Sequence, residues 1–499
     1  MPSGEYSDKV TGLHRVFSEG IFVSKKAVSF LMMPVISVAL WGCGEKNKEN
    51  ITVGEHISEY VRTADNVSAA MMYPKYWLDM QKEPYKVIMS AHEIESWNQM
   101  YEAANDGNLY EFEGYDDENE PHIVGKGILL SLLSKEFNTK GPSLYDETGK
   151  LITEDLVNII NERRNLSAVK EENAIGYGYT VSRADIRAFP YEGLVTADKD
   201  SNYICEFQVS SILINEPVLI LHESTDGKWY YIFSRFCSGW IKSDCIGVCH
   251  GYDEWKQAME YTDFLVVTGD KIVLEKDAGN DDVSELTLYM GSKLELVKYE
   301  KYVVDGNKRV PYENYIVKIP VRDEKGFLKS TYGFVPVSRD VHMGYLAYTA
   351  ENLINQMFKV NGNRYGWGGM YNARDCSQYI LEVYSTFGFR FGRNSATQSE
   401  MPFETYDISK MNEDEKKKIL DNVPTGSILY FPGHVMMYLG KTGEEYYVIS
   451  ATGRMMSADD GDDNAIYAHT TLITPLSVRR ISKKTWLESL TVIKVIKME

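Results

Sequence analysis

Tyr365-Gly366-Trp367-Gly368-Gly369, followed by Asp375-Cys376-Ser377, is the part of the 499-residue sequence that best predicts both fold and chemistry. The glycines let a backbone pass close to a ligand. Beyond Cys376, apolar residues recur at helical spacing up to Gly388, which suits a helix end. Asp375 is typical of an N-cap, which places Cys376 in the first helical turn. Since the helix dipole favours a thiolate there, we expect Cys376 to be an ionised nucleophile; a buried structural thiol is the alternative.

A thiol nucleophile needs a base, and His434 is the best candidate among nine His residues. Residues 427–431 and 434–439 have the pattern of two strands, with His434, Met436 and Tyr438 on one face. If Leu439 pairs with Glu445, Ser450 lies opposite His434, where its hydroxyl can accept the Nδ1–H and orient the ring. A slip of one residue would reverse the faces, and a purely structural His434 is the alternative.

The rest of the chain predicts an α+β protein with several domains. Residues 55–170 favour helices, with a capping box at Ser90-x-x-Glu93. Two groups of short β runs follow and predict small barrels. The first group is 204–209, 218–222, 229–233 and 239–242; the second is 264–267, 272–274, 286–289 and 315–319.

The N-terminal segment has the pattern of an export signal. Lys25-Lys26 precede an apolar run over 27–41, and Leu40-Trp41-Gly42-Cys43 is similar to a bacterial lipobox, in which the Cys is lipidated. We therefore expect an exported lipoprotein of the cell envelope, anchored to a membrane through Cys43 and facing the periplasm or the cell surface. An uncleaved anchor or a simple signal peptide is the alternative. A net charge of −19 argues against nucleic acid as a partner.

The remaining cysteines suggest no cofactor. Cys205, Cys237, Cys245 and Cys249 predict one or two disulfides or plain buried thiols. Cys245-x-x-x-Cys249-His250 lacks a second ligand pair, so we expect no zinc site. The run Asp459-Asp460-Gly461-Asp462-Asp463 predicts a solvated loop, and no metal or other cofactor is expected.

Taken together, these motifs resemble the NlpC/P60 cysteine peptidases of bacterial cell walls, in their branch with two bacterial SH3 (SH3b) domains. The resemblance rests on the motifs around Tyr365 and Cys376, on Arg393-Asn394-Ser395-x-x-Gln398 and on Gly433-His434-Val435. Upstream, Ser182-Arg183-x-Asp185-x-Arg187 and Gly239-Trp240 are similar to the first SH3b domain. The implied organisation is a signal peptide with lipobox (1–43), a linker (44–58), a stabilising helical region (59–172), SH3b domains (173–250 and 251–338) and a papain-like catalytic domain (339–499).

The resemblance implies hydrolysis of the γ-D-Glu–diamino acid bond in peptidoglycan stem peptides that carry a free N-terminal L-Ala. Cys376 matches the nucleophile, His434 the general base and Tyr365 a residue near the oxyanion. Asp375 and Ser377 match positions beside the substrate's N-terminus, where Glu206, or else Glu223, would supply a second carboxylate. The family's third catalytic position is usually His; here it falls on Ser450, with His469 as a substitute if the chain folds back.

Two other functions stay open at this point. The protein could be an inactive lipoprotein that binds muropeptides or cell wall, or an amidase or acyltransferase that uses the same Cys–His pair. In every case the expected partners are muropeptides and a membrane, and a monomer is expected. The sequence does not distinguish diaminopimelate from Lys in the substrate.

Overall fold

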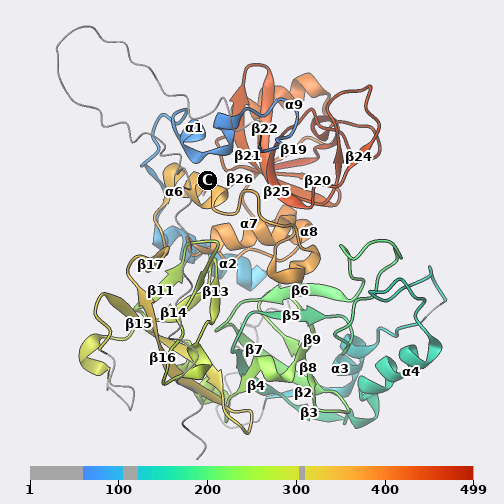
Figure 1. The fold of residues 1–499 in the computed structure, drawn as a ribbon, viewed down its shortest axis with the longest axis vertical. Helices are drawn as coiled ribbons and strands as arrows, with labels where there is room; N and C mark the ends of the chain where they lie inside the picture. Colours follow the sequence, from blue (N-terminus) through green and yellow to red (C-terminus); the bar gives the residue numbers. More distant parts are fainter. Residues whose placement is uncertain (1–59, 105–121, 139, 303–309, 498–499) are drawn as a thin grey trace, which may run out of the picture. The chain divides into compact units, whose positions relative to one another are not determined.

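The computed structural model describes residues 60–104, 122–138, 140–302 and 310–497. The predicted signal peptide and Cys43 lie outside the described residues. Within them, no helix has both the length and the apolar character that crossing a membrane requires. The described chain mixes helices and antiparallel sheets, so the predicted α+β class is confirmed (Figure 1).

Helices are the main regular elements before residue 175, with short strands and irregular segments between them. Its elements are α1 (Pro74–Leu78), β1 (Val87–Met89), α2 (Ala91–Ala104), β2 (Ile123–Gly125), α3 (Lys126–Leu133), α4 (Glu154–Arg163) and β3 (Glu172–Ala174). The capping box of α2 is present, because the Glu93 carboxylate accepts the Ser90 N–H at 2.7 Å. Trp97 of α2 stacks on Phe403 with ring centroids 4.3 Å apart, which joins this segment to the core of the C-terminal region.

The first β region forms one antiparallel sheet with the order β10-β4-β7-β8-β9-β5-β6. Its strands are β4 (Gly176–Thr180), β5 (Ala184–Arg187), β6 (Gln208–Ile212), β7 (Pro217–Glu223), β8 (Trp229–Phe233), β9 (Ser238–Lys242) and β10 (Ile246–Val248). Three of the four predicted strands match closely. The fourth, predicted at 204–209, begins only at Gln208, because a turn in which the Gln208 N–H donates to the Cys205 carbonyl precedes it.

The second β region follows α5 (Tyr252–Gln257) and consists of small separate sheets around one apolar core. The strand orders are β14-β11-β17, β12-β13 and β15-β16. The strands are β11 (Phe264–Val267), β12 (Lys271–Val273), β13 (Thr287–Tyr289), β14 (Lys293–Glu295), β15 (Asn314–Arg322), β16 (Leu328–Pro336) and β17 (Val341–Met343). The four predicted strands correspond to β11, β12, β13 and β15.

The C-terminal region is built on a six-stranded antiparallel sheet with the order β19-β26-β20-β21-β22-β25. Its strands are β19 (Glu404–Asp407), β20 (Ile428–Phe431), β21 (His434–Thr442), β22 (Glu445–Thr452), β25 (Thr470–Pro475) and β26 (Val492–Val495). The helices are α6 (Ala350–Phe358), α7 (Cys376–Ser385), α8 (Ser395–Glu400), α9 (Glu413–Leu420) and α10 (Trp486–Ser489). Shorter strands are β18 (Tyr348–Thr349), β23 (Met455–Met456) and β24 (Ala465–Ile466).

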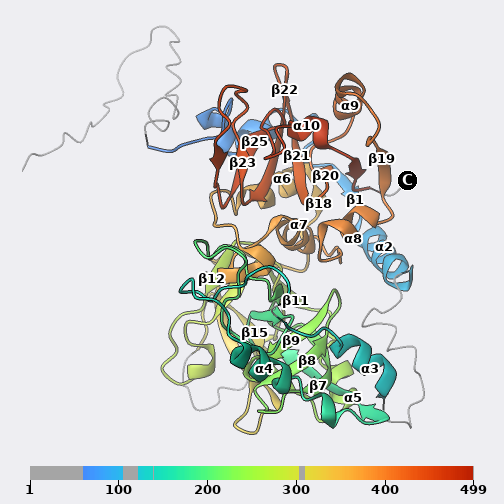
Figure 2. The same ribbon diagram turned by 90° about the vertical axis from the view of Figure 1, so that its right-hand side faces the viewer.

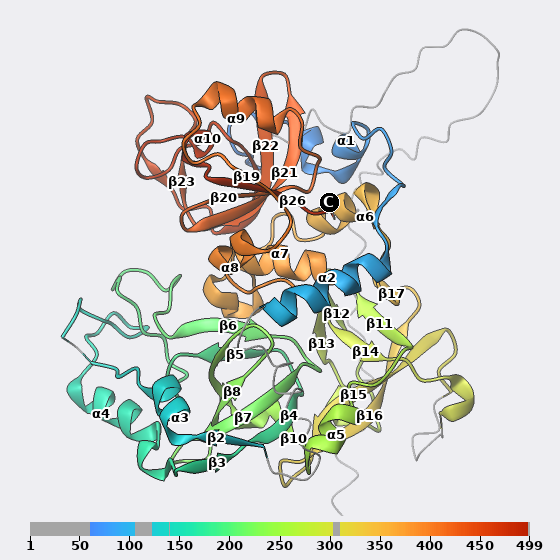
Figure 3. The same cartoon turned by 180° about the vertical axis from the view of Figure 1, so that it is seen from behind.

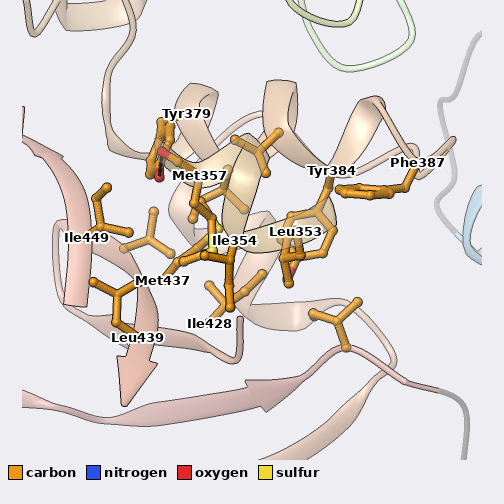
Figure 4. Close-up of a cluster of buried hydrophobic side chains, with 14 of the residues drawn as sticks. Leu353, Ile354, Met357, Tyr379, Tyr384, Phe387, Ile428, Met437, Leu439 and Ile449 are labelled. Atoms are coloured by element: carbon orange, nitrogen blue, oxygen red, sulfur yellow. Dashed lines mark hydrogen bonds between the residues drawn. The ribbon is translucent and has the colours of Figure 1, made fainter. Parts of the chain in front are cut away.

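Both faces of this sheet are covered, because its strands alternate apolar side chains between two cores. Figure 4 shows one core, in which Met437 and Leu439 of β21 pack against Met357 of α6 and Tyr379 of α7. Met436 and Tyr438 point into the other core, with residues of α9 and α10. Figures 2 and 3 show α7 and α9 on opposite sides of the strands. The sheet thus holds α7 firmly against β21.

The pairing of β21 with β22 differs from the predicted register. Thr442, not Leu439, pairs with Glu445, and a bulge lies between Tyr438 and Gly440, whose φ is 142°. Continuing the Met437–Ile449 pairing to the start of β21 places Thr452, not Ser450, opposite His434. The predicted register is therefore wrong. Because the difference is an even number of residues, Ser450 still lies on the face that carries His434.

Candidate active site

Cys376 lies where the sequence predicts it, at the first residue of α7. Asp375 is the N-cap, and its carboxylate accepts the Gln378 N–H at 2.8 Å. The Cys376 side chain is half-buried, and the backbone N–H groups of Val435 and Ser377 donate hydrogen bonds to its sulfur. Val435 directly follows His434, so the thiol lies against the backbone next to the proposed base.

His434 stands at the start of β21 and is held by contacts on two sides. Its Nε2 lies 3.1 Å from the Ser450 hydroxyl, which lies 2.9 Å from the Thr452 hydroxyl. The ring also packs against Phe431 and Trp486, with centroids 5.3 and 5.1 Å away. The hydrogen bond to Ser450 is present as predicted but uses Nε2 instead of Nδ1. Nδ1 is therefore the ring nitrogen left for a thiol proton.

The electrostatics of the pair differ from the expected thiolate. Desolvation, together with the Asp375 charge, raises the pKa of Cys376 to about 12. Desolvation, together with Arg480, lowers the pKa of His434 to about 4. Both shifts have desolvation as their main cause, and both favour a neutral thiol and imidazole over the thiolate that the sequence predicts. At neutral pH the pair consists of a thiol and an uncharged imidazole.

Asp375 is engaged by a buried arginine. Arg393 donates to both of its carboxylate oxygens, at 3.1 and 2.7 Å. Ser377 donates to the same carboxylate at 3.0 Å, and so does the Gly368 N–H, also at 3.0 Å. Burial is the largest single effect and opposes ionisation, but Arg393 and the hydrogen bonds from Gln378 and Ser377 together outweigh it, so the pKa of Asp375 is lowered. Both oxygens are used internally, so these contacts do not support the predicted pairing of Asp375 with a substrate ammonium group.

Tyr365 lies near enough to Cys376 for the two groups to interact electrostatically. Desolvation raises its pKa, and a negative charge on Cys376 would raise it further. The phenol therefore keeps its proton and is able to donate a hydrogen bond. Glu206 is exposed and immediately precedes Phe207 and β6, whose Gln208 amide donates to the Gly368 carbonyl at 3.0 Å. This contact brings the strand that follows Glu206 next to the glycine-rich segment.

His469 does not replace Ser450 as the partner of His434. Its ring stacks on Tyr203 of the first β region, with centroids 3.6 Å apart and planes 8° apart. Its backbone has φ 44°, and its carbonyl accepts the Tyr365 N–H at 2.9 Å. The structural role that the sequence leaves open for His469 is therefore the one these contacts support.

Sequence reasoning missed two features of the site. Thr452 extends the His434–Ser450 contact, and the alternation of β22 could have indicated it, since residues two apart share a face. A buried ionic network around α7 joins both β regions to the C-terminal region. Glu382 of α7 pairs with Arg183 and Arg374, and Arg374 also pairs with Asp270 at 2.6 Å. No local pattern could have indicated these pairs.

The other cysteines form no disulfide bond within the described residues. Cys205, Cys237, Cys245 and Cys249 are all free thiols, so the disulfide alternative is wrong; Cys205 and Cys249 are buried, and Cys237 and Cys245 are half-buried. The described residues contain no group of three or more His, Cys, Asp or Glu placed to hold a metal ion. The acidic loop at 459–463 wraps around Arg479, which donates to the Asp462 carbonyl at 2.7 Å.

A cysteine at the start of a helix that packs on an antiparallel sheet, with a histidine on the adjacent strand, defines the papain-like class of hydrolase folds. The comparisons with known proteins agree with this class. The NlpC/P60 family profile matches residues 362–495, and the profile "SH3 domain (SH3b1 type)" matches residues 197–242. The chain is thus a multidomain protein with an SH3b and an NlpC/P60 domain. The predicted domain boundaries stay predictions.

A solved structure shows the same fold over most of the chain. An NlpC/P60 endopeptidase from Photobacterium damselae subsp. piscicida is 20% identical, with 85% of this chain and 97% of that chain covered and a TM-score of 0.65. An NlpC/P60 family protein from Bacillus cereus ATCC 10987 is 15% identical, with 64% and 98% covered and a TM-score of 0.43. No curated protein matches the chain. The two domains support a cell-wall hydrolase that binds peptidoglycan.

Proposed function

We propose that the protein is a cysteine endopeptidase that hydrolyses the γ-D-Glu–diamino acid bond of stem peptides with a free N-terminal L-Ala. One observation carries the proposal. Within the NlpC/P60 domain, Cys376 at the start of α7 lies against Val435, the neighbour of His434, whose Nε2 is bound to Ser450. The identity of the bond and of the N-terminal residue comes from the family resemblance.

The neutral state of the Cys376 thiol and the His434 imidazole indicates how the proposed reaction begins. His434 Nδ1 takes the Cys376 proton as the sulfur attacks the γ-carbonyl carbon, and the carbonyl oxygen becomes an oxyanion beside the Tyr365 hydroxyl. The resulting imidazolium gives its proton to the leaving amine, which departs and leaves a thioester. His434 then deprotonates a water molecule that hydrolyses the thioester, and the proton returns to the thiol. Ser450 holds the ring throughout.

Recognition of the substrate's ammonium group needs a carboxylate other than Asp375. Glu206 is exposed and precedes the strand that contacts Gly368, which supports it as the second carboxylate. Glu206→Gln should then raise KM for the free peptide without changing kcat. The same variant should leave the hydrolysis of an N-acetylated peptide unchanged, since that peptide has no ammonium group.

The cellular setting is proposed from the sequence. The protein is an exported lipoprotein, anchored through Cys43 and acting as a monomer on short peptides in the cell envelope. Restriction to peptides with a free N-terminus suits the recycling of wall fragments better than lysis of intact wall.

The direct test is incubation with L-Ala-γ-D-Glu-diaminopimelate and detection of the free diamino acid by mass spectrometry. Wild type should release it, whereas Cys376→Ala and His434→Ala should not. A Lys-containing peptide tests the diamino acid preference. Preferred hydrolysis of N-acetylated peptides would favour an amidase.

The second candidate is an inactive protein that binds muropeptides. The raised pKa of Cys376 and the packing of the His434 ring against Trp486 favour it. It predicts that wild type releases no diamino acid and that Cys376→Ala binds muropeptides as tightly as wild type does. Titration calorimetry with the same peptide distinguishes the two candidates.

A further inference from the structure

A cavity of about 320 Å³ lies against the face of α7 that points away from the catalytic sheet. Gln378, Leu381 and Ser385 line it, whereas Tyr379, Ile380 and Val383 of the same helix pack into the sheet's core. The spacing of these two sets assigns them to different sides of the helix. The other walls come from both β regions and from the segment between α7 and α8.

Five basic side chains line this cavity, Arg235, Lys256, Lys293, Arg390 and Arg393, together with the carboxylates of Glu216, Glu260 and Glu382. Arg390 is paired with Glu102 at 2.9 Å, and Arg235 lies 4.0 Å from Glu216. For Lys293, no carboxylate of the described residues lies within salt-bridge distance. Its ammonium group instead lies over the rings of Phe264, Tyr261 and Tyr345, 4.4, 4.9 and 5.7 Å from their centroids.

This environment leaves Lys293 partly desolvated with no carboxylate in direct contact. Burial is the main cause that lowers its pKa, and Arg390 lowers it further, whereas the charges of Glu216 and Glu95 oppose the shift without cancelling it. The aromatic faces offset part of the cost of desolvating the ammonium group. They do not supply the negative charge that a buried cation otherwise takes from an ion pair. A ligand carboxylate beside Lys293 would supply it and would also attract Arg235.

We propose that this cavity is a binding site for a small organic carboxylate of about dipeptide size. Lys293 and Arg235 bind the carboxylate group, and the aromatic and apolar wall that includes Phe236, Met259 and Tyr345 contacts the rest of the ligand. The volume is at the lower end of the range typical of small-molecule pockets. Mixed apolar walls favour an organic acid over a bare inorganic anion. The site is separate from Cys376 and does not depend on the proposed peptidase activity.

One connection joins this cavity to the candidate active site. Arg393 lines the cavity and also holds Asp375, the N-cap of the nucleophile's helix. A ligand in the cavity therefore contacts the network that fixes the start of α7. We expect binding to stabilise α7 against local opening, which hydrogen exchange of its amides would measure.

The test uses the full chain with Cys376→Ala, so that no turnover interferes, and glutarate as the probe in titration calorimetry. Glutarate should bind at a single site, whereas glutaramide, its uncharged isostere, should not bind. Lys293→Met should weaken the binding by about 10- to 100-fold, the range expected for losing a hydrogen bond to a charged group. Lys293→Arg should retain it, and Lys75→Met, at an exposed helical position, is the matched control. Circular dichroism confirms that each variant is folded.

Several outcomes would overturn the proposal. No binding of glutarate at about 10 mM would exclude a site of useful affinity. Equal binding of glutarate and glutaramide would show that charge plays no part, and preferential binding of inorganic phosphate would assign a different ligand class. Unchanged affinity in both Lys293→Met and Arg235→Met would place the bound glutarate elsewhere. Because turnover is absent from the assay, none of these results depends on the peptidase proposal.

Discussion

Arg393→Met tests most directly whether the buried ion pair between Arg393 and Asp375 stabilises the start of α7. Arg393 is 7% exposed and forms hydrogen bonds with Asp375, Ser377, Gln378 and Ser210. Its removal leaves the Asp375 carboxylate buried without a cation, and breaking a buried pair in this way costs about 3–5 kcal/mol. Since every 1.4 kcal/mol is about a factor of ten, local opening of α7 should increase by roughly 100- to 1000-fold or more.

Hydrogen exchange followed by mass spectrometry measures this opening without assuming that the whole multidomain chain unfolds in one step. The amides of α7 should exchange faster by that factor in Arg393→Met. In the double variant that combines Asp375→Asn with Arg393→Met, the α7 amides should regain much of their protection against exchange. The reason is that the neutral Asn still caps the helix and needs no cation. Lys75→Met is the control: its pair with Asp79 is exposed, at 81% and 62%, and contributes at most about 1 kcal/mol.

The pH dependence of this effect on α7 gives a second check, and the direction of the change is fixed by the pKa of Asp375. In wild type the folded-state pKa of Asp375 is lowered, so its contribution is complete above the unfolded value of 3.8 and is lost as the pH falls through the folded value. In Arg393→Met the carboxyl should protonate at a higher pH. The difference between variant and wild type should therefore shrink on acidification. Exchange within threefold of wild type at neutral pH, or strictly additive effects in the double variant, would refute the reasoning.

Three further predictions concern the proposed catalytic pair. Ser450→Ala should lower kcat/KM by about 10- to 100-fold, because the imidazolium loses a hydrogen-bond partner, and peptide hydrolysis assays would show it. The kcat/KM profile should stay level from pH 8 to pH 5 and fall near pH 4. The reason is that His434 must be neutral to take the thiol proton, and its pKa is about 4. A break in the profile near pH 6.5 would contradict this assignment. Iodoacetamide labelling of Cys376, measured by difference from Cys376→Ala, should accelerate about tenfold per unit between pH 7 and pH 9 because the thiol pKa is raised to about 12. A plateau below pH 8 would instead indicate a thiolate.

Local patterns were enough to predict the helix that carries the nucleophile. An N-cap at Asp375, apolar residues at helical spacing and Gly388 after the last turn are all encoded within a few residues, and α7 spans Cys376–Ser385 as they indicate. The alternation of β21 likewise placed Met436 and Tyr438 in one core. Such features need no knowledge of what packs against them.

The register of β22 and the ionisation of Cys376 depend on information that is not local. β21 runs to Thr442, three residues beyond the predicted Leu439, and the bulge before Gly440 changes the pairing by one residue, so the pairing at Met437 lies two residues from the predicted register. A strand pattern without an aligned partner does not reveal such a bulge. The pKa of Cys376 depends on how completely neighbouring elements remove water from the thiol, which the helix position alone does not determine. Arg393 appears in a quoted motif, but nothing in its spacing identifies Asp375 as its partner.

The contacts around α7 also change how the SH3b region should be regarded. Arg183, which precedes β5, pairs with Glu382, and its guanidinium also donates to the Ala373 carbonyl at 2.7 Å. Arg393 donates to the Ser210 hydroxyl of β6 at 2.6 Å. These partners come from the first β region, so a chain reduced to residues 339–499 would leave Glu382 and Arg393 short of the groups that satisfy them. The first β region is therefore part of the structure that fixes the nucleophile's helix. Its removal should lower activity even toward substrates that never contact it.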